Sequence, residues 1–396
     1  MYEMHMRKAT AALVGLLLAG VAATPAHAGT IRSQQWHLDA MKADEIWKIT
    51  TGKGITVAVI DTGVNRIPEL DGQVLPGAVF PAGDAPGDKD NDYDGHGTGM
   101  AAAIAGTGKH PSGDGAYGLA PGTKILPIRV PDLMEKSTTP SWAAAIRYAA
   151  DSDAKVINIP HGRSGKPEDD RERAEAVKYA LSKGKLIFAA AGNSGNSTNR
   201  IEYPAATPGV VAVGAVDSQG EPTNESQHGP QIDLAAPGMD IVMACTGKTG
   251  LCKTHGTSDS SALASASAAL LWSAHPDWTN NQVLRVLLNT AGKPADGTAR
   301  NDFVGYGIAR PRVALETPGD PGPADVFPLP DLAAADGKNS PAPSADGKKP
   351  ESNSPAPQAE AKKDGGSSLL WIGLGLGACV LIGGAVTAVV VRRRNA

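Results

Sequence analysis

Residues 253–262 read Lys253-Thr254-His255-Gly256-Thr257-Ser258-Asp259-Ser260-Ser261-Ala262, and a run of small residues and leucines continues to Leu271. This pattern predicts a glycine-containing turn followed by a helix. The hydroxyl of Ser258 would lie beside the unpaired N–H groups of the helix start, where negative charge on a reacting substrate is stabilised. Serine and threonine are also ordinary N-cap residues, so the turn by itself favours a helix cap. A catalytic interpretation of Ser258 needs partners elsewhere in the chain.

Apolar runs of strand length precede this turn. Each is a continuous stretch bounded by turn-forming residues, as is typical of strands buried on both faces of a parallel sheet. The runs are Ile55–Ile60, Ile125–Val130, Val156–Ile159, Leu186–Ala190 and Val210–Gly214.

Segments with helical spacing lie before and between these runs. They are Leu38–Ile49, Gly97–Ala105, Ser141–Ala150 and Glu168–Lys183. Alternating strands and helices predict a three-layer α/β sandwich with a mostly parallel central sheet. Ligands of such sheets gather outside the carboxyl ends of the strands.

Polar residues stand at the expected strand ends and helix starts. Asp61 follows the first strand, His96 opens a small-residue helix between two glycines, and Asn193 lies in the glycine-rich turn after Leu186–Ala190. Each has an ordinary alternative role: Asp61 as a turn or cap residue, His96 as a solvated loop residue, Asn193 as a left-handed turn residue. Their chemistry also fits a site, since an Asn amide can donate a hydrogen bond to a developing oxyanion.

Together with Ser258, these residues resemble the subtilisin-like serine proteases. Ile-Asp-Thr-Gly at Asp61, Gly-His-Gly-Thr at His96, Ala-Ala-Gly-Asn at Asn193 and Gly-Thr-Ser at Ser258 occur in the order of that family. The resemblance covers residues 36–316 approximately. It implies that Ser258 attacks the scissile carbonyl, that His96 takes and returns the proton, and that Asp61 orients the imidazolium. It also implies that Asn193 and the backbone N–H of Ser258 receive the oxyanion.

The same resemblance implies a substrate channel along the strand that begins at Val156, where an extended polypeptide would pair. Asn158, Ile159 and Gly162 are the substrate-binding residues expected there. The chain departs from the usual Asn-x-Ser-x-Gly pattern at Pro160, which cannot donate a backbone hydrogen bond, so one pairing bond with substrate would be lost or redirected.

A second departure follows the nucleophile. Where the family shows a hydrophobic residue, small residues and proline, this chain has Asp259-Ser260-Ser261-Ala262. At a helix start the charge of Asp259 would be favourable for the helix dipole.

The two ends of the chain predict export and membrane anchoring. Residues 1–28 have the charge, apolar run and small-x-small site of a secretory signal peptide. Residues 369–391 carry no charge, are long enough for a transmembrane helix, and precede a basic tail at 392–396. By the positive-inside rule the C-terminus is cytoplasmic, which gives a single-pass cell-membrane protein with an extracytoplasmic body.

The domain plan completes this organisation. We expect a short N-terminal extension at 29–50, a peptidase domain at 51–316 and a Pro/Ala-rich disordered linker at 317–368. The plan resembles that of the mycosins, membrane-anchored subtilisin-like proteases of actinobacterial type VII secretion. That resemblance implies a narrow-specificity endopeptidase with type VII secretion membrane components as partners. The alternative is a structural subunit that stabilises a secretion complex, with dispensable catalysis.

Cysteines, metals and charge set the remaining expectations. Cys245 and Cys252 lie close together in an exported domain and predict a disulfide, with free buried thiols as the alternative. The acidic run 88–94 resembles a calcium loop but lacks the completing glutamate, so we expect a solvated acidic loop, with calcium as the lesser alternative. No other metal or cofactor is expected. The formal net charge of −4 with scattered basic residues argues against a nucleic-acid partner.

Overall fold

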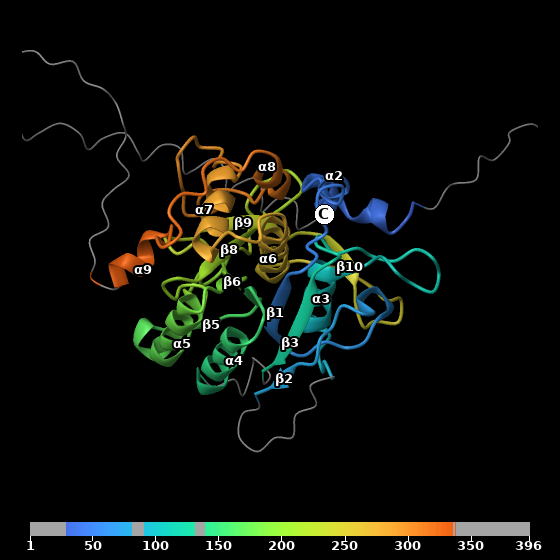
Figure 1. The fold of residues 1–396 in the computed structure, drawn as a ribbon, viewed down its shortest axis with the longest axis horizontal. Coiled ribbons are helices and arrows are strands. Elements are labelled where there is room, and N and C mark those ends of the chain that lie inside the picture. The colour runs from blue at the N-terminus through green and yellow to red at the C-terminus, as the bar shows by residue number, and fades with distance from the viewer. Residues whose placement is uncertain (1–28, 81–90, 131–138, 336, 338–396) are drawn as a thin grey trace, which may run out of the picture. The chain divides into compact units, whose positions relative to one another are not determined.

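The computed structural model describes residues 29–80, 91–130, 139–335 and 337 (Figure 1). The predicted signal peptide, transmembrane helix and basic tail lie outside these residues, as does most of the predicted linker. Across the described residues, no helix combines the length and the apolar character needed to cross a membrane.

The centre of the fold is a seven-stranded sheet. Every neighbouring pair of strands is parallel, which confirms the predicted parallel sheet. In spatial order the strands are β2 (Ala78–Val79), β3 (Lys124–Arg129), β1 (Thr56–Asp61), β4 (Val156–Ile159), β6 (Leu186–Ala190), β8 (Val211–Val216) and β9 (Leu234–Pro237).

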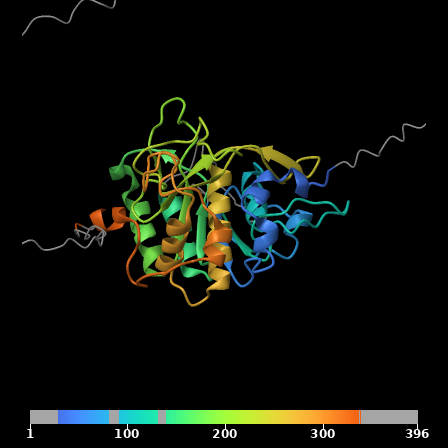
Figure 2. The same ribbon diagram turned by 90° about the horizontal axis from the view of Figure 1, so that it is seen from above.

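Helices cover both faces of the sheet (Figure 1, Figure 2). Because successive strand residues point to opposite faces, Val57 and Val59 of β1 join one hydrophobic core and Ala58 and Ile60 join the other. The helices of the first core are α3 (His96–Ala105), α6 (Thr257–Ala274) and α7 (Asn280–Thr290). Those of the second are α4 (Thr139–Asp151) and α5 (Arg171–Ser182). The expected three layers are therefore present.

Helix α6 is buried on nearly all sides, from Thr257 to Trp272. Its many alanines and serines keep its surface narrow, so it packs closely against the strands and against α3. The side chains of Ser260, Ser265 and Ser267 each have a hydrogen-bond acceptor, which satisfies these hydroxyls in the interior. The first turn of this rigid central helix carries Ser258.

Two predicted helices differ from the structure. The segment Leu38–Ile49 forms two short helices, α1 (Trp36–Ala40) and α2 (Ala43–Ile46), because Lys42 between them adopts a left-handed conformation with φ 62°. Helix α5 begins at Arg171, later than predicted, since a short 3₁₀ helix, Pro167–Asp170, precedes it.

Short elements complete the described residues. They are the 3₁₀ helices Arg32–Gln34 and Pro68–Leu70, the pair β5 (Arg163–Ser164) and β7 (Glu202–Tyr203), the hairpin β10 (Ile241–Ala244) and β11 (Leu251–Thr254), and the helices α8 (Pro311–Glu316) and α9 (Pro330–Ala335).

The folded body extends beyond the predicted peptidase domain at both ends. In the extension, buried Gln35 donates to the carbonyls of Tyr117 and Val242. In the predicted linker, Leu329 lies in the main core and Asp331 accepts from the backbone N–H of Gly209 at 2.8 Å. The first part of the segment predicted to be disordered thus packs on the body. Leu329 buries an apolar side chain and Asp331 binds a backbone N–H, and the overall Pro/Ala-rich composition of the segment does not reveal these two contacts.

Candidate active site

Asp61 lies at the carboxyl end of β1 and is the centre of the site. Its side chain is 1% exposed and accepts hydrogen bonds from several groups. The backbone N–H of Thr62 donates to Oδ1 at 2.6 Å. His96 Nδ1 lies 3.0 Å from Oδ1 and 2.9 Å from Oδ2, and His161 Nε2 lies 2.6 Å from Oδ1. A carboxylate held in this way can orient an imidazole and stabilise its charged form.

His96 is the first residue of α3 and approaches Asp61 closely. The contact depends on the next residue, Gly97: a Cβ there would lie 2.2 Å from the carbonyl oxygen of Gly63 and 3.0 Å from Asp61 Cβ. Any larger residue at Gly97 would push the helix start away from β1. The structure therefore places the side chains of His96 and Asp61 within hydrogen-bond distance.

Asp92 organises the loop before α3, which is a finding that the sequence did not predict. It is 5% exposed and accepts from Thr62 Oγ1 at 2.7 Å and from the backbone N–H of Thr98 at 2.8 Å. The expectation of a wholly solvated acidic loop is wrong at this residue. Asp88 and Asp90 lie outside the described residues, so the calcium alternative stays a prediction.

Ser258 is the second residue of α6, and Gly256 occupies the N-cap position. The helix-cap alternative for Ser258 therefore does not hold. Its Oγ donates to the carbonyl oxygen of Pro160 at 2.7 Å, and no hydrogen bond among the described residues joins it to His96. Hydrogen bonds between catalytic groups are often long or misaligned before substrate binds, and a change of the Ser258 rotamer would reorient Oγ.

Asn193 follows β6 and its side chain is exposed. Its Oδ1 accepts from the backbone N–H of Thr257 at 2.9 Å and from Thr257 Oγ1 at 3.0 Å. These bonds fix the amide beside the residue that precedes Ser258 and direct its oxygen toward protein donors. Because Oδ1 is occupied in this way, Nδ2 is the atom of the amide that can donate a hydrogen bond to another group.

The predicted substrate-binding residues lie in different surroundings. Asn158 and Ile159 of β4 are fully buried, and Asn158 Oδ1 accepts from Ser265 Oγ of α6 at 3.2 Å. Neither side chain reaches a surface where substrate could contact it, because β4 is central in the sheet and covered on both faces. Gly162 is half-buried, beyond the end of β4, and is the one of the three still placed to meet a substrate.

His161 is the functional candidate that sequence reasoning missed. It comes from the segment after β4, and its ring centroid lies 4.2 Å from that of His96. The sequence offered one indication of its role: His161 lies between Pro160 and Gly162, in a stretch that was expected to line the substrate channel.

The electrostatics of the site follow from these contacts. Burial lowers the pKa of His96, but the charge and hydrogen bond of Asp61, with smaller effects of Asp259 and Asp94, raise it to about 9. Burial would raise the pKa of Asp61, yet His161 and His96 hold it far below its usual range. Burial, together with the charge of His96, lowers the pKa of His161 against the opposing charge and hydrogen bond of Asp61.

Asp259, next to Ser258, does not behave as an exposed helix-start charge. It is 1% exposed and accepts from Thr254 Oγ1 at 3.0 Å. Burial raises its pKa to about 7, against the opposing effects of Thr254 and His96. The favourable interaction of the Asp259 charge with the helix dipole, expected from the sequence, is thus outweighed by the cost of removing this carboxylate from water.

One group of side chains in the described residues could hold a metal ion. Asp61, His96 and His161 each offer one ligand atom, and these atoms lie within 4.8 Å of one another. Nitrogen and carboxylate ligands suit zinc, but an ion there would occupy the atoms through which Asp61 orients His96.

The predicted disulfide is confirmed. Cys245 and Cys252 are bonded, and they join the end of β10 to β11. This hairpin leads directly into the turn that carries Ser258, so the disulfide stabilises the approach to the helix start.

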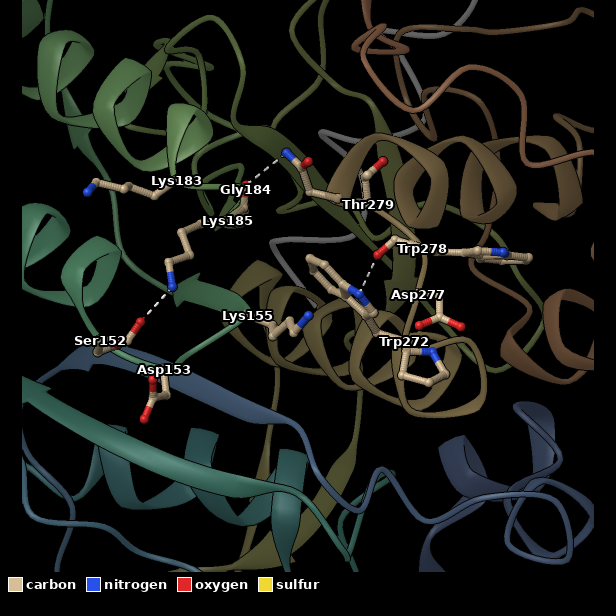
Figure 3. A pocket seen from close by; sticks show the side chains of 12 residues that line it. Ser152, Asp153, Lys155, Lys183, Gly184, Lys185, Trp272, Asp277, Trp278 and Thr279 are labelled. Atoms are coloured by element: carbon tan, nitrogen blue, oxygen red, sulfur yellow. Dashed lines mark hydrogen bonds between the residues drawn. The ribbon is translucent and has the colours of Figure 1, made fainter.

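A pocket lies at the opposite end of the sheet from Asp61 (Figure 3). Lys155 and Lys185, which directly precede β4 and β6, line it together with Trp272 and Trp278. In Figure 3, Lys185 Nζ donates to the Ser152 carbonyl and Trp272 Nε1 to that of Trp278. This pocket contains none of the predicted site residues.

Comparisons with known proteins agree with the fold. Residues 52–307 match the subtilase family, Peptidase S8. Mycosin-1 of Mycolicibacterium smegmatis is 33% identical over 331 residues, which cover 71% of this chain and 72% of that protein. The crystal structure of MycP1 from Mycobacterium smegmatis superposes with a TM-score of 0.64 at 31% identity, covering 74% of this chain and 86% of that one. A chain in the structure of an intact ESX-5 inner membrane complex is 27% identical, with a TM-score of 0.64 over 82% of this chain and 84% of its own.

Proposed function

This chain belongs to the subtilase family of serine endopeptidases, and on that premise we propose that Asp61, His96 and Ser258 are its catalytic triad. The observation that carries the proposal is the contact of His96 Nδ1 with the buried carboxylate of Asp61, at 2.9 to 3.0 Å. Because Nδ1 is engaged there, Nε2 of the same ring is the nitrogen left to accept a proton from Ser258.

The proposed reaction proceeds through an acyl-enzyme. Ser258 leaves its bond to the Pro160 carbonyl, passes its proton to His96 and attacks the scissile carbonyl. Asn193 Nδ2 and the backbone N–H of Ser258 stabilise the oxyanion, and His96 then protonates the leaving amine. Water repeats the sequence to release the acid product. Only protein groups are needed, so we propose a reaction without a cofactor.

The substrate in this proposal is an extended polypeptide. The backbone after β4 runs beside Ser258, as its bond to the Pro160 carbonyl shows. Pro160 has no N–H to offer a substrate strand, and its carbonyl already accepts from the nucleophile. A substrate therefore has fewer backbone partners on this side, which favours recognition through side chains and a narrow specificity.

We propose further that the enzyme is held in the cell membrane with its peptidase domain outside the cytoplasm. The apolar segment 369–391 and the arginines that follow it support this topology. The similarity to mycosin-1 and to a chain of an ESX-5 inner membrane complex supports a link to type VII secretion.

A structural role in such a complex is the second candidate. It is favoured by one observation, the Ser258 hydroxyl bonded to Pro160 instead of His96. In this alternative the chain stabilises the assembly and proteolysis is dispensable.

Two measurements test these proposals. Purified wild-type protein should be labelled by a fluorophosphonate probe, Ser258→Ala should not, and the exposed loop variant Ser197→Ala should react like the wild type. In the native cell, Ser258→Ala is compared with full deletion. If secretion is lost on deletion but not in the Ser258→Ala strain, the structural role is established. The enzyme proposal is refuted if the probe does not label the wild-type protein and if the processing of cell-surface proteins is unchanged in the Ser258→Ala strain.

A further inference from the structure

Glu202 is a half-buried carboxylate beside the site that triad chemistry does not use. It opens β7, which pairs with β5 so that Glu202 lies opposite Ser164. Its Oε1 accepts from Gln227 Nε2 at 2.9 Å. Among the described residues, no cationic side chain forms an ion pair with it.

Two glycines bring separate segments against this carboxylate. A Cβ on Gly162 would lie 2.6 Å from Glu202 Oε2, and a Cβ on Gly192 would lie 2.8 Å from Glu202 Cδ. Only residues without a side chain allow both segments to approach so closely. The carboxylate therefore lies between the segment after β4 and the segment after β6.

The same two segments flank the nucleophile. The first contains Pro160, whose carbonyl accepts from Ser258 Oγ at 2.7 Å. The second contains Asn193, whose Oδ1 accepts from the backbone N–H of Thr257 at 2.9 Å. A substrate carbonyl above Ser258, with its oxygen toward Asn193, places its own residue between these segments. The side chain of that residue would then extend toward Glu202, which lies against Gly162 and Gly192.

The negative charge of the Glu202 carboxylate is only partly compensated by its neighbours. Burial raises the pKa of the Glu202 carboxyl, and the hydrogen bond from Gln227 opposes that shift. A half-buried carboxylate with one neutral donor is stabilised by a cation that brings its own hydrogen bonds. Arginine and lysine supply such a cation at the end of a flexible apolar stem.

We propose that Glu202 binds the cationic side chain of the residue that supplies the scissile carbonyl, so that the enzyme cleaves after arginine or lysine. This inference rests on the proposed protease function and names its substrate class. The chemistry of cleavage is unchanged: the carboxylate selects substrate and takes no part in bond breaking.

A purely structural role for Glu202 predicts different behaviour. Gln227 also donates to Ser194 Oγ at 2.8 Å, so the carboxylate helps to hold the loop that carries Asn193. Glu202→Gln keeps an oxygen acceptor for Gln227 and removes only the charge. Glu225→Gln is the matched control, since Glu225 is another acidic residue of the neighbourhood and pairs with His255.

The test uses the full chain and peptides that differ only in the residue before the scissile bond, arginine or its neutral isostere citrulline. We expect kcat/KM to favour arginine by roughly 10- to 100-fold, as for one charge-assisted hydrogen bond. Glu202→Gln should abolish this ratio while cleavage of the citrulline peptide persists, and Glu225→Gln should retain it. Equal cleavage of both peptides by the wild type, or an unchanged ratio in Glu202→Gln, overturns the inference.

A binding measurement decides the matter without turnover. Agmatine, a small guanidinium compound, should bind the wild-type chain in calorimetry and bind Glu202→Gln at least about tenfold more weakly. Equal binding to both overturns the inference, as does no binding to the wild type. Fluorophosphonate labelling separates the proposal for Glu202 from the proposed protease function. If the probe labels the chain but the chain does not prefer arginine, only the role of Glu202 is refuted. If the probe does not label the chain and the chain cleaves no peptide, the protease function is refuted.

Discussion

His161 Nε2 lies 2.6 Å from Asp61 Oδ1, so the carboxylate of the proposed triad contacts two imidazoles at once. His161 is 13% exposed at its side chain and its ring lies against that of His96. A hydrogen bond from His161 stabilises the Asp61 carboxylate and makes it a weaker acceptor for His96. The second imidazole therefore affects how strongly Asp61 holds a proton on His96.

The pH dependence of the wild type is the first prediction. His96 acts as a base only when neutral, and its pKa is raised to about 9 from 6.5. The proton is retained at neutral pH and is lost as pH rises through the raised value, so kcat/KM should increase from neutral into alkaline pH. Rates at constant ionic strength across that range check this, and a plateau already reached at pH 7 would contradict it.

Replacing His161 should shift this profile. In His161→Leu, Asp61 loses its second partner and acts on His96 alone, so the pKa of His96 should rise further and the midpoint of kcat/KM should move to higher pH. His275→Leu, which changes a histidine stacked on Trp278 outside the site, should leave the midpoint in place. The same midpoint in His161→Leu as in the wild type would show that His161 has no electrostatic effect on the base.

Asn193→Ala should lower turnover by about 10²–10³, the range established for loss of the oxyanion donor in subtilisin. The expected loss is in kcat, because the oxyanion exists only after attack. KM should change little. Asn196→Ala, an exposed residue of the same loop, is the control. Since Asn193 also accepts from Thr257, thermal unfolding of each variant should be recorded, and a loss of turnover matched by Asn196→Ala would refute the assignment.

Asp259→Asn should stabilise the protein at alkaline pH. The pKa of Asp259 is about 7 in the folded protein against an ordinary 3.8, so the folded state binds the extra proton. Its stabilising effect is complete below pH 4 and is lost as pH rises through 7. The amide variant should therefore increase the free energy of unfolding by about 1–4 kcal/mol at pH 8 and leave it unchanged at pH 4.

Denaturant unfolding at both pH values checks the Asp259 prediction. Asp240→Asn serves as the control because Asp240 is an exposed residue that pairs with Lys253 at 2.9 Å. An Asp259→Asn variant that is no more stable at pH 8 than the wild type would mean that the burial of this carboxylate is compensated in solution.

Loss of the disulfide should destabilise the hairpin that leads to Ser258. Cys245→Ser with Cys252→Ser opens a loop with a sequence separation of 7, which corresponds to about 2–3 kcal/mol in the chain-entropy account. Urea unfolding without reductant measures the difference. Cys379→Ser, which removes the remaining cysteine, should unfold like the wild type. A double variant as stable as the wild type would refute the stabilising role.

Local sequence determined much of the framework. Continuous apolar runs ending in Asp61 or in the turn to Asn193 can be recognised as buried strands, since few polar residues interrupt them. The small-residue run after Ser258 predicts a buried helix for the same reason. The order of Asp61, His96, Asn193 and Ser258 then indicated the site through resemblance, and the structure places Asp61 and His96 in contact.

The tertiary structure alone decided the finer chemistry. Whether Asn158 meets substrate or Ser265, whether Asp259 is solvated, and whether His161 reaches Asp61 all depend on how the ends of separate strands meet across the sheet. Glu202 lies between Gly162 and Gly192 for the same reason. Local patterns carry no information on such distances, because burial and contact between remote segments arise only when the sheet and its helices pack together.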